Sequence, residues 1–131
     1  MAAEGQNGSK MLDEMSEYRI FELLKKYHYT LTTAESATGG MIASTLINVP
    51  GISAFFTEGY VTYSNEAKVK MIHVKPETIE RYGVVSAETA ADMAVSAART
   101  ACASTRSNTS RMPSSPTSCT TSGLRALLCS T

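Results

Sequence analysis

The chain has 131 residues, enough for one domain with a hydrophobic core and too few for two. Twelve Lys and Arg balance twelve Asp and Glu, and only 7% of residues are aromatic, so neither nucleic acid nor an anionic membrane is favoured as a partner. There is no apolar run of about 18 residues and no secretory signal pattern. The three cysteines show no CxxC spacing, which indicates neither a disulfide framework nor a zinc site. We therefore expect a cytoplasmic domain without metal or other cofactor.

The first half of the chain predicts a helix, a strand and a second helix. Residues 1–9 are polar and contain glycine, which is typical of a disordered tail. Apolar residues then recur every three or four positions from Met11 to Tyr27, as in an amphipathic helix. "YTLTTAE" at 29–35 predicts a buried strand, and "TGGMIASTLINV" at 38–49 has helical spacing up to the following Pro-Gly.

The second half predicts an extended segment followed by three helices. "SAFFTEGYVTYS" at 53–64 is extended, and short helices are expected at 65–72 and 75–83. Ser86 then caps an alanine-rich helix over 87–103. This order predicts an α/β fold, a single three-layer domain with a central mixed sheet flanked by helices.

Ser36 lies where the predicted strand ends and the next helix begins. A side chain at the carboxyl end of a buried strand faces the crevice in which α/β proteins bind ligands. The Thr-Gly-Gly at 38–40 opens a helix whose free N–H groups can hold an anion or an oxyanion. Alternatively, Ser36 or Thr38 merely caps the helix, and spacing alone favours this second interpretation.

A serine nucleophile needs a base, and the chain has only two histidines. The better candidates lie in "GYVTYSNEAK" at 59–68. A lysine in a desolvated crevice can lose its proton near neutral pH and activate a serine, and a tyrosine hydroxyl can relay the proton. Tyr63 and Lys68 can face one crevice. Taken alone, a solvated Lys68 and a Tyr63 packed on the sheet are the simpler interpretation.

Three segments, in order and spacing, resemble the C-terminal amidohydrolase domain of the CinA (competence/damage-inducible protein) family: "TAESATGG" (33–40), "PGISAFFTEGYVTYSNEAK" (50–68) and "VKPETIERYGVVSAETAADMA" (74–94). The resemblance runs from about residue 12 to residue 103. It implies a nicotinamide-nucleotide amidase that converts nicotinamide mononucleotide to nicotinic acid mononucleotide and ammonia, in pyridine-nucleotide (NAD) recycling. It also implies a metal-free enzyme, a small-molecule nucleotide as its partner, and homo-oligomers.

The resemblance assigns roles to particular residues. It implies that Ser36 is the nucleophile and that Tyr63 and Lys68 activate it. Four residues are expected to bind the substrate: Thr38, Gly39, Gly40 and Asn65.

Residues 104–131 depart from the family pattern. Ser and Thr occupy fourteen of these 28 positions, and we find no helix or strand period among them. Relatives continue instead with a strand and a "TGIAGP"-type loop. We therefore expect an incomplete amidohydrolase domain over 10–103, with the C-terminal part of the fold missing. An aberrant or disordered Ser/Thr-rich tail over 104–131 follows, and a frame change explains it better than an evolved tail. Lost strands would leave sheet edges unpaired, so we expect poor folding and weak or no activity.

Two other functions remain open. The Thr-Gly-Gly helix start can bind a nucleotide phosphate in a non-catalytic or regulatory module, with no chemistry at Ser36. The small-residue face of 90–101 can serve a purely structural oligomerisation unit, but that interpretation leaves the polar residues of 59–68 unexplained.

Overall fold

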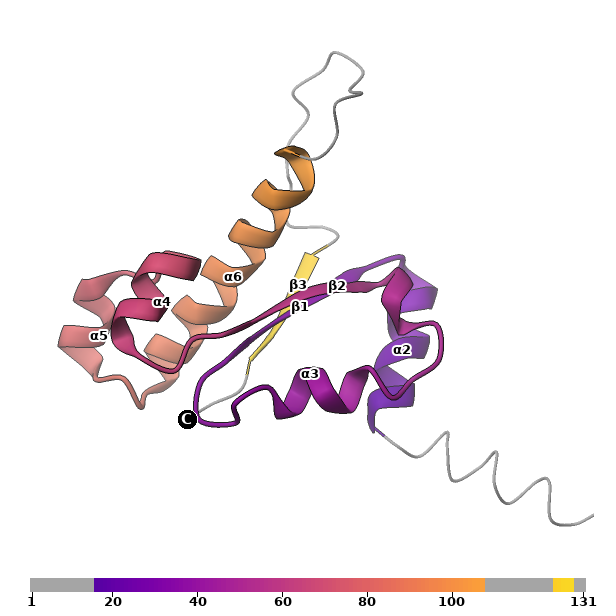
Figure 1. Ribbon diagram of the computed structural model, residues 1–131, viewed down its shortest axis with the longest axis horizontal. Coiled ribbons are helices and arrows are strands. Elements are labelled where there is room, and N and C mark those ends of the chain that lie inside the picture. The colour runs from indigo at the N-terminus through magenta and orange to yellow at the C-terminus, as the bar shows by residue number, and fades with distance from the viewer. Residues whose placement is uncertain (1–15, 108–123, 129–131) are drawn as a thin grey trace, which may run out of the picture.

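The computed structural model describes residues 16–107 and 124–128 (Figure 1). The α/β order expected from the sequence is confirmed. The predicted disordered tail at 1–9 lies outside the described residues. The elements, in chain order, are α2 (Ser16–Tyr27), β1 (Thr30–Glu35), α3 (Met41–Leu46), the 3-10 turn η1 (Ile52–Ala54), β2 (Phe56–Val61), α4 (Asn65–Ile72), α5 (Pro76–Tyr82), α6 (Ala87–Ser107) and β3 (Leu124–Leu128).

Strand β1 is the centre of the sheet, in which the order is β2-β1-β3. Both pairings of β1 are parallel, so among the described strands the sheet is parallel and the expected mixed sheet is wrong in this respect. Parallel sheets are covered on both faces and their strands are buried on both. Accordingly, every residue of β1 after Thr30 is buried.

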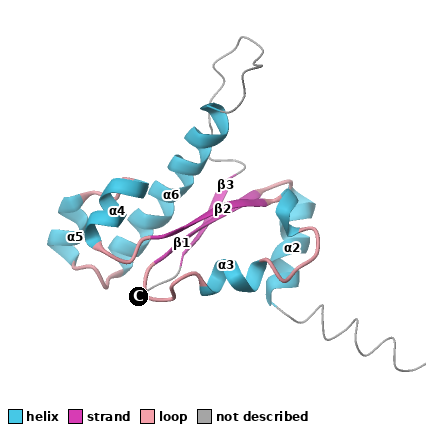
Figure 2. Cartoon of the chain, viewed as in Figure 1, coloured by secondary structure: helices cyan, strands magenta, loops and turns pink. Residues whose placement is uncertain are grey.

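Helices cover both faces of the sheet (Figures 1 and 2). Because successive strand side chains point to opposite faces, Leu31 and Ala34 belong to different cores. Leu31 packs with residues of α2, α3, η1 and the turn between α3 and η1, namely Leu24, Leu46, Ile52 and Val49. Ala34 packs with residues of α4 and α6 and the segment after α4, namely Ile72, Val74, Met93 and Ala97. The three-layer arrangement is therefore confirmed.

Two segments beyond residue 103 have regular structure. Helix α6 continues to Ser107, and β3 pairs with β1 from Thr30 opposite Leu124 to Ala34 opposite Leu128. The expectation that no helix or strand survives after residue 104 is wrong for these two segments. Strand β3, with the sequence "LRALL", runs parallel to β1 and pairs with it over five residues. The edge of β1 that we expected to be unpaired is covered by β3.

Helix α4 covers the range expected from the sequence and is capped by the serine that precedes it. The Ser64 hydroxyl accepts a hydrogen bond from the Ala67 N–H at 3.0 Å, so Ser64 is the N-cap and Asn65 is the first helical residue. The predicted Ser86 cap of α6 is confirmed by a 3.1 Å bond from the Thr89 N–H.

Cys102 is disulfide-bonded, which the cysteine count and spacing did not predict. None of the helices in the described ranges is long and apolar enough to cross a membrane. The cytoplasmic location stays a prediction.

The Thr33 hydroxyl allows a direct test of the β1 core. Thr33 is buried and its Oγ1 has no hydrogen-bond partner within the described part of the chain, whereas the neighbouring Thr32 Oγ1 donates to the Glu58 carbonyl at 2.7 Å. A buried hydroxyl without a partner costs stability, and a methyl group of the same shape removes that cost. We expect Thr33→Val to raise the free energy of unfolding by about 1 kcal/mol in urea denaturation. Thr32→Val is the matched control and should lower it by about 1 kcal/mol; the same sign for both variants would contradict the assignment.

Candidate active site

Ser36 and Lys68 meet although 32 positions separate them in the chain. Ser36 follows the last residue of β1 and is only 7% exposed, and Lys68 extends from α4 and is fully buried. The Lys68 Nζ lies 3.0 Å from the Ser36 Oγ. The exposed Lys68 of the simpler interpretation is therefore wrong, because α4 packs its Lys68 face against the end of the sheet.

Two backbone carbonyls complete the surroundings of the Lys68 amine. The Nζ donates to the Thr62 carbonyl at 2.8 Å and to the Tyr63 carbonyl at 3.2 Å. No carboxylate lies within ion-pair distance of Lys68 among the residues that the structure describes. Burial therefore lowers the pKa of Lys68 below its usual value. In the neutral amine, the two N–H groups can serve the two carbonyls, which leaves the lone pair for the Ser36 hydroxyl proton.

Glu35 is a site residue that the sequence analysis missed. Its carboxylate is fully buried and accepts four hydrogen bonds at the start of α3. The donors are the Thr38 hydroxyl (2.8 Å) and the backbone N–H groups of Gly40 (3.1 Å), Ile42 (3.0 Å) and Ala43 (2.9 Å). Burial by itself raises the pKa of Glu35, but the bonds from Ala43, Thr38, Ile42 and Gly40 outweigh it, so the pKa lies below its usual value. No local signal in the sequence indicates this role, because the donors that Glu35 meets depend on how α3 packs against the end of β1.

The loop between β1 and α3 is held differently from the way we expected. Gly39 and Gly40 have φ angles of 60° and 103°, a left-handed conformation that favours glycine. The Gly39 N–H donates to the Ser36 carbonyl, and the Gly40 N–H and the Thr38 hydroxyl are bonded to Glu35. The start of α3 is thus filled by the protein itself, so it offers no free anion site. Ser36 and Thr38 do not cap α3 with their side chains either.

Two N–H groups of the loop have no acceptor among the residues that the structure describes. Within the described residues, the backbone N–H groups of Ala37 and Thr38 donate no hydrogen bond. They belong to the two residues that directly follow Ser36. When a serine attacks a carbonyl group, the oxyanion that forms needs hydrogen-bond donors close to the serine oxygen, and these two N–H groups follow Ser36 directly in the chain.

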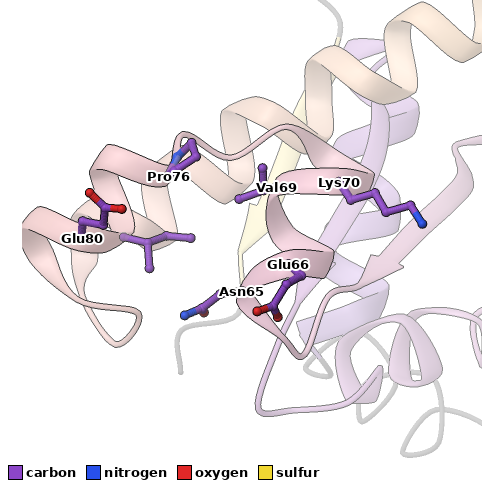
Figure 3. Close-up of a pocket in the computed structure, with 7 residues that line it drawn as sticks. Asn65, Glu66, Val69, Lys70, Pro76 and Glu80 are labelled. Carbon is purple, nitrogen blue, oxygen red and sulfur yellow. The ribbon is translucent and has the colours of Figure 1, made fainter.

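The structure does not bring the Tyr63 and Asn65 side chains to Ser36. The Tyr63 side chain is 76% exposed, and this residue contributes to the site through its carbonyl. Asn65 is exposed and lines an open cavity of about 440 Å³ between α4 and α5 (Figure 3). The other lining residues are Glu66, Val69, Lys70, Pro76, Ile79 and Glu80. The side-chain role of Tyr63 and substrate binding by Asn65 stay predictions.

Tyr60, another polar residue of the same segment, is hydrogen-bonded to Glu58 and not to Ser36 or Lys68. Its hydroxyl donates to the Glu58 carboxylate at 2.9 Å. Burial, together with the bond and the charge of Glu58, raises the pKa of Tyr60 to about 12, so its phenol stays protonated at neutral pH. In the ranges covered by the structure, no three His, Cys, Asp or Glu side chains are grouped so that they could hold a metal ion.

Solved structures with the same fold come from CinA-related proteins. The competence/damage inducible protein CihA from Agrobacterium tumefaciens superposes with a TM-score of 0.60 at 41% sequence identity, over 63% of this chain and 50% of that one. A competence-damaged protein (CinA) superfamily protein from Escherichia coli gives 0.62 at 38% identity, over 64% of this chain and 49% of that one. The chain therefore corresponds to about half of each solved structure.

Curated relatives show the same similarity over the same part of the chain. A CinA-like protein from Kosmotoga olearia is 49% identical over 89 residues, which are 68% of this chain and 22% of the relative. A putative competence-damage inducible protein from Clostridium perfringens is 59% identical over 82 residues, 63% of this chain and 20% of the relative. The chain thus spans about a fifth of the length of these relatives. The family model of the CinA C-terminal domain matches residues 13–109, so that the chain, with Ser36 and Lys68 inside the matched region, belongs to the CinA C-terminal domain family.

Proposed function

We propose that the chain carries the nucleophile and base of a serine amidohydrolase that deamidates nicotinamide mononucleotide. The observation that carries this proposal is the 3.0 Å contact between the Ser36 Oγ and a fully buried Lys68 Nζ. An amine with a lowered pKa, directed at a serine hydroxyl by two carbonyls, is the arrangement that serine activation by lysine requires.

The first half of the proposed reaction transfers the acyl group to Ser36. Neutral Lys68 takes the Ser36 proton as the oxygen attacks the carboxamide carbon of the substrate. The carbonyl oxygen becomes an oxyanion, for which the N–H groups of Ala37 and Thr38 are the available donors. The Lys68 ammonium then gives its proton to the leaving nitrogen, ammonia departs, and a Ser36 ester remains.

The second half of the reaction releases the product. Lys68, neutral again, takes a proton from a water molecule that attacks the ester carbonyl. Nicotinic acid mononucleotide leaves, and the Ser36 oxygen recovers its proton from Lys68. Each proton removed by Lys68 is returned in the same half-reaction, so the cycle is balanced and needs no redox partner.

The substrate is inferred from family resemblance in "TAESATGG" and "VTYSNEAK". The chain has no "TGIAGP" segment, so we expect turnover to be slow. The non-catalytic alternative is less favoured, because it places a phosphate on helix N–H groups that Glu35 already occupies. A homo-oligomer stays a prediction.

Replacing Ser36 by alanine tests the nucleophile. We expect Ser36→Ala to reduce ammonia release from nicotinamide mononucleotide to the uncatalysed background, while nucleotide binding in calorimetry stays near that of the parent chain. The reason is that the attacking oxygen is lost and the surrounding backbone is kept. Ser44→Ala, at an exposed position of α3, is the matched control and should change neither quantity. Ammonia release that persists in Ser36→Ala would remove Ser36 from the role of nucleophile.

A further inference from the structure

Glu35 and Ser36 are consecutive residues whose side chains are held on opposite sides of the sheet. The Glu35 carboxylate is bonded to α3, and the Ser36 hydroxyl is bonded to Lys68 of α4. Consecutive strand residues alternate between faces, so the direction of one side chain restricts that of the next. The Glu35 carbonyl is also fixed, because it accepts the Thr62 N–H at 2.8 Å.

We propose that Glu35 is a positioning residue, which fixes the β1–α3 loop so that the Ser36 hydroxyl faces Lys68 and the Ala37 and Thr38 N–H groups stay free. This proposal rests on the proposed function, because it takes Ser36 as the nucleophile. The four hydrogen bonds of the Glu35 carboxylate tie the end of β1 to the Thr38 hydroxyl and to the first turn of α3. Figure 2 shows that only a short loop joins these two elements.

The chemistry at this position calls for a carboxylate. Glu35 faces four donors, and an ionised carboxylate is the side-chain group that only accepts hydrogen bonds and does so with two oxygens. A glutamine would place an NH₂ group against at least one of these donors. The backbone N–H groups would then seek other acceptors, and the loop that carries Ser36 would lose its fixed path.

The position of Glu35 also separates its role from that of the base. Lys68 is bonded to Ser36 and to the carbonyls of Thr62 and Tyr63, and Glu35 makes none of these contacts. A change at Glu35 should therefore alter how often Ser36 is correctly oriented, while the pH at which Lys68 loses its proton stays the same.

The test uses covalent labelling of Ser36, which does not depend on the identity of the natural substrate. The full chain is treated with methanesulfonyl fluoride, and the rate of adduct formation at Ser36 is followed by mass spectrometry across a range of pH. Because misplacing a reacting group costs large factors in rate, we expect Glu35→Gln to lower the labelling rate about tenfold or more without moving its pH midpoint. Amide hydrogen exchange at Gly40, Ile42 and Ala43 should become faster in the same variant.

Glu58→Gln is the matched control. Glu58 is a partly buried glutamate on the neighbouring strand and is bonded to Tyr60. Ser36 should therefore be labelled in Glu58→Gln at the same rate as in the parent chain. An unchanged labelling rate in Glu35→Gln, with faster amide exchange, would overturn the positioning role and leave only a helix cap. A shifted pH midpoint, or an equal fall in Glu58→Gln, would also overturn it.

Failure of the proposed function has a different result. If the parent chain forms no adduct at Ser36, Ser36 is not an activated nucleophile, and the positioning role falls with it. A parent chain that is labelled at Ser36 but responds to Glu35→Gln as the control does leaves the proposed function intact and overturns the role of Glu35 alone.

Discussion

Replacing Lys68 by methionine is expected to lower both the labelling of Ser36 and the release of ammonia by about 10²–10⁴-fold, the range typical of a lost general base. Methionine fills a similar volume without an amine, so the fully buried position stays occupied. Lys70→Met is the matched control, because Lys70 lies on the same helix but is exposed. Loss of labelling in Lys70→Met to the same extent would contradict a specific role for Lys68.

The pH dependence of stability gives a second measurement on the same variant. Burial lowers the pKa of Lys68 in the folded chain, whereas the unfolded chain keeps the ordinary value. Between these two pKa values the unfolded state binds more protons, so this contribution to the free energy of unfolding rises with pH. It is fully present above the unfolded pKa and is lost as the pH falls through the folded pKa. The difference in stability between the parent chain and Lys68→Met, followed by urea denaturation across pH, should show this slope. A difference that does not vary with pH would contradict the lowered pKa.

Replacing Gly59 by alanine is expected to destabilise the sheet by about 1–3 kcal/mol, because the added methyl group would be overpacked against the buried Thr33. Gly59 lies opposite Thr33 in the pairing of β1 with β2. A Cβ atom at this position would overlap the Thr33 Oγ1 and would lie 3.2 Å from the Phe56 ring. Urea denaturation of Gly59→Ala measures the effect.

A double variant tests whether the contact with Thr33 causes this loss of stability, or whether β2 tolerates no side chain at position 59. Thr33→Ala removes the Oγ1 atom that a Cβ at position 59 would meet. Thr33→Ala combined with Gly59→Ala should therefore lose less stability than the sum of the two single changes, as residues in contact are not additive. Strict additivity would show that Thr33 is not the obstacle.

The local pattern of the sequence was sufficient for most elements of the fold. The apolar spacing before Tyr27 and the β-branched run at 29–35 predicted α2 and β1, and Ser86 marked the start of α6. These signals act within a few residues of one another, so they can be recognised without knowledge of the fold. Strand β3 was missed because its five residues acquire a role only beside β1.

The candidate site was predicted in part. Family resemblance pointed to Ser36 and Lys68, and the structure places them 3.0 Å apart. Glu35 was read only as the end of a strand, because nothing in the local sequence shows which donors a buried carboxylate will meet. The N–H groups at the start of α3, which the sequence predicted to be free, are hydrogen-bonded to the Glu35 carboxylate.

By itself, the sequence determined the α/β order and the family to which the chain is similar, because each depends on residue types at short spacing. The tertiary structure alone decided three things: that Lys68 is buried, that its amine reaches Ser36, and that Glu35 takes the N–H groups of α3. Each of these depends on distant segments packing around one sheet. Burial and long-range contacts set the pKa values and bonds that separate a catalytic pair from a surface lysine and a helix cap.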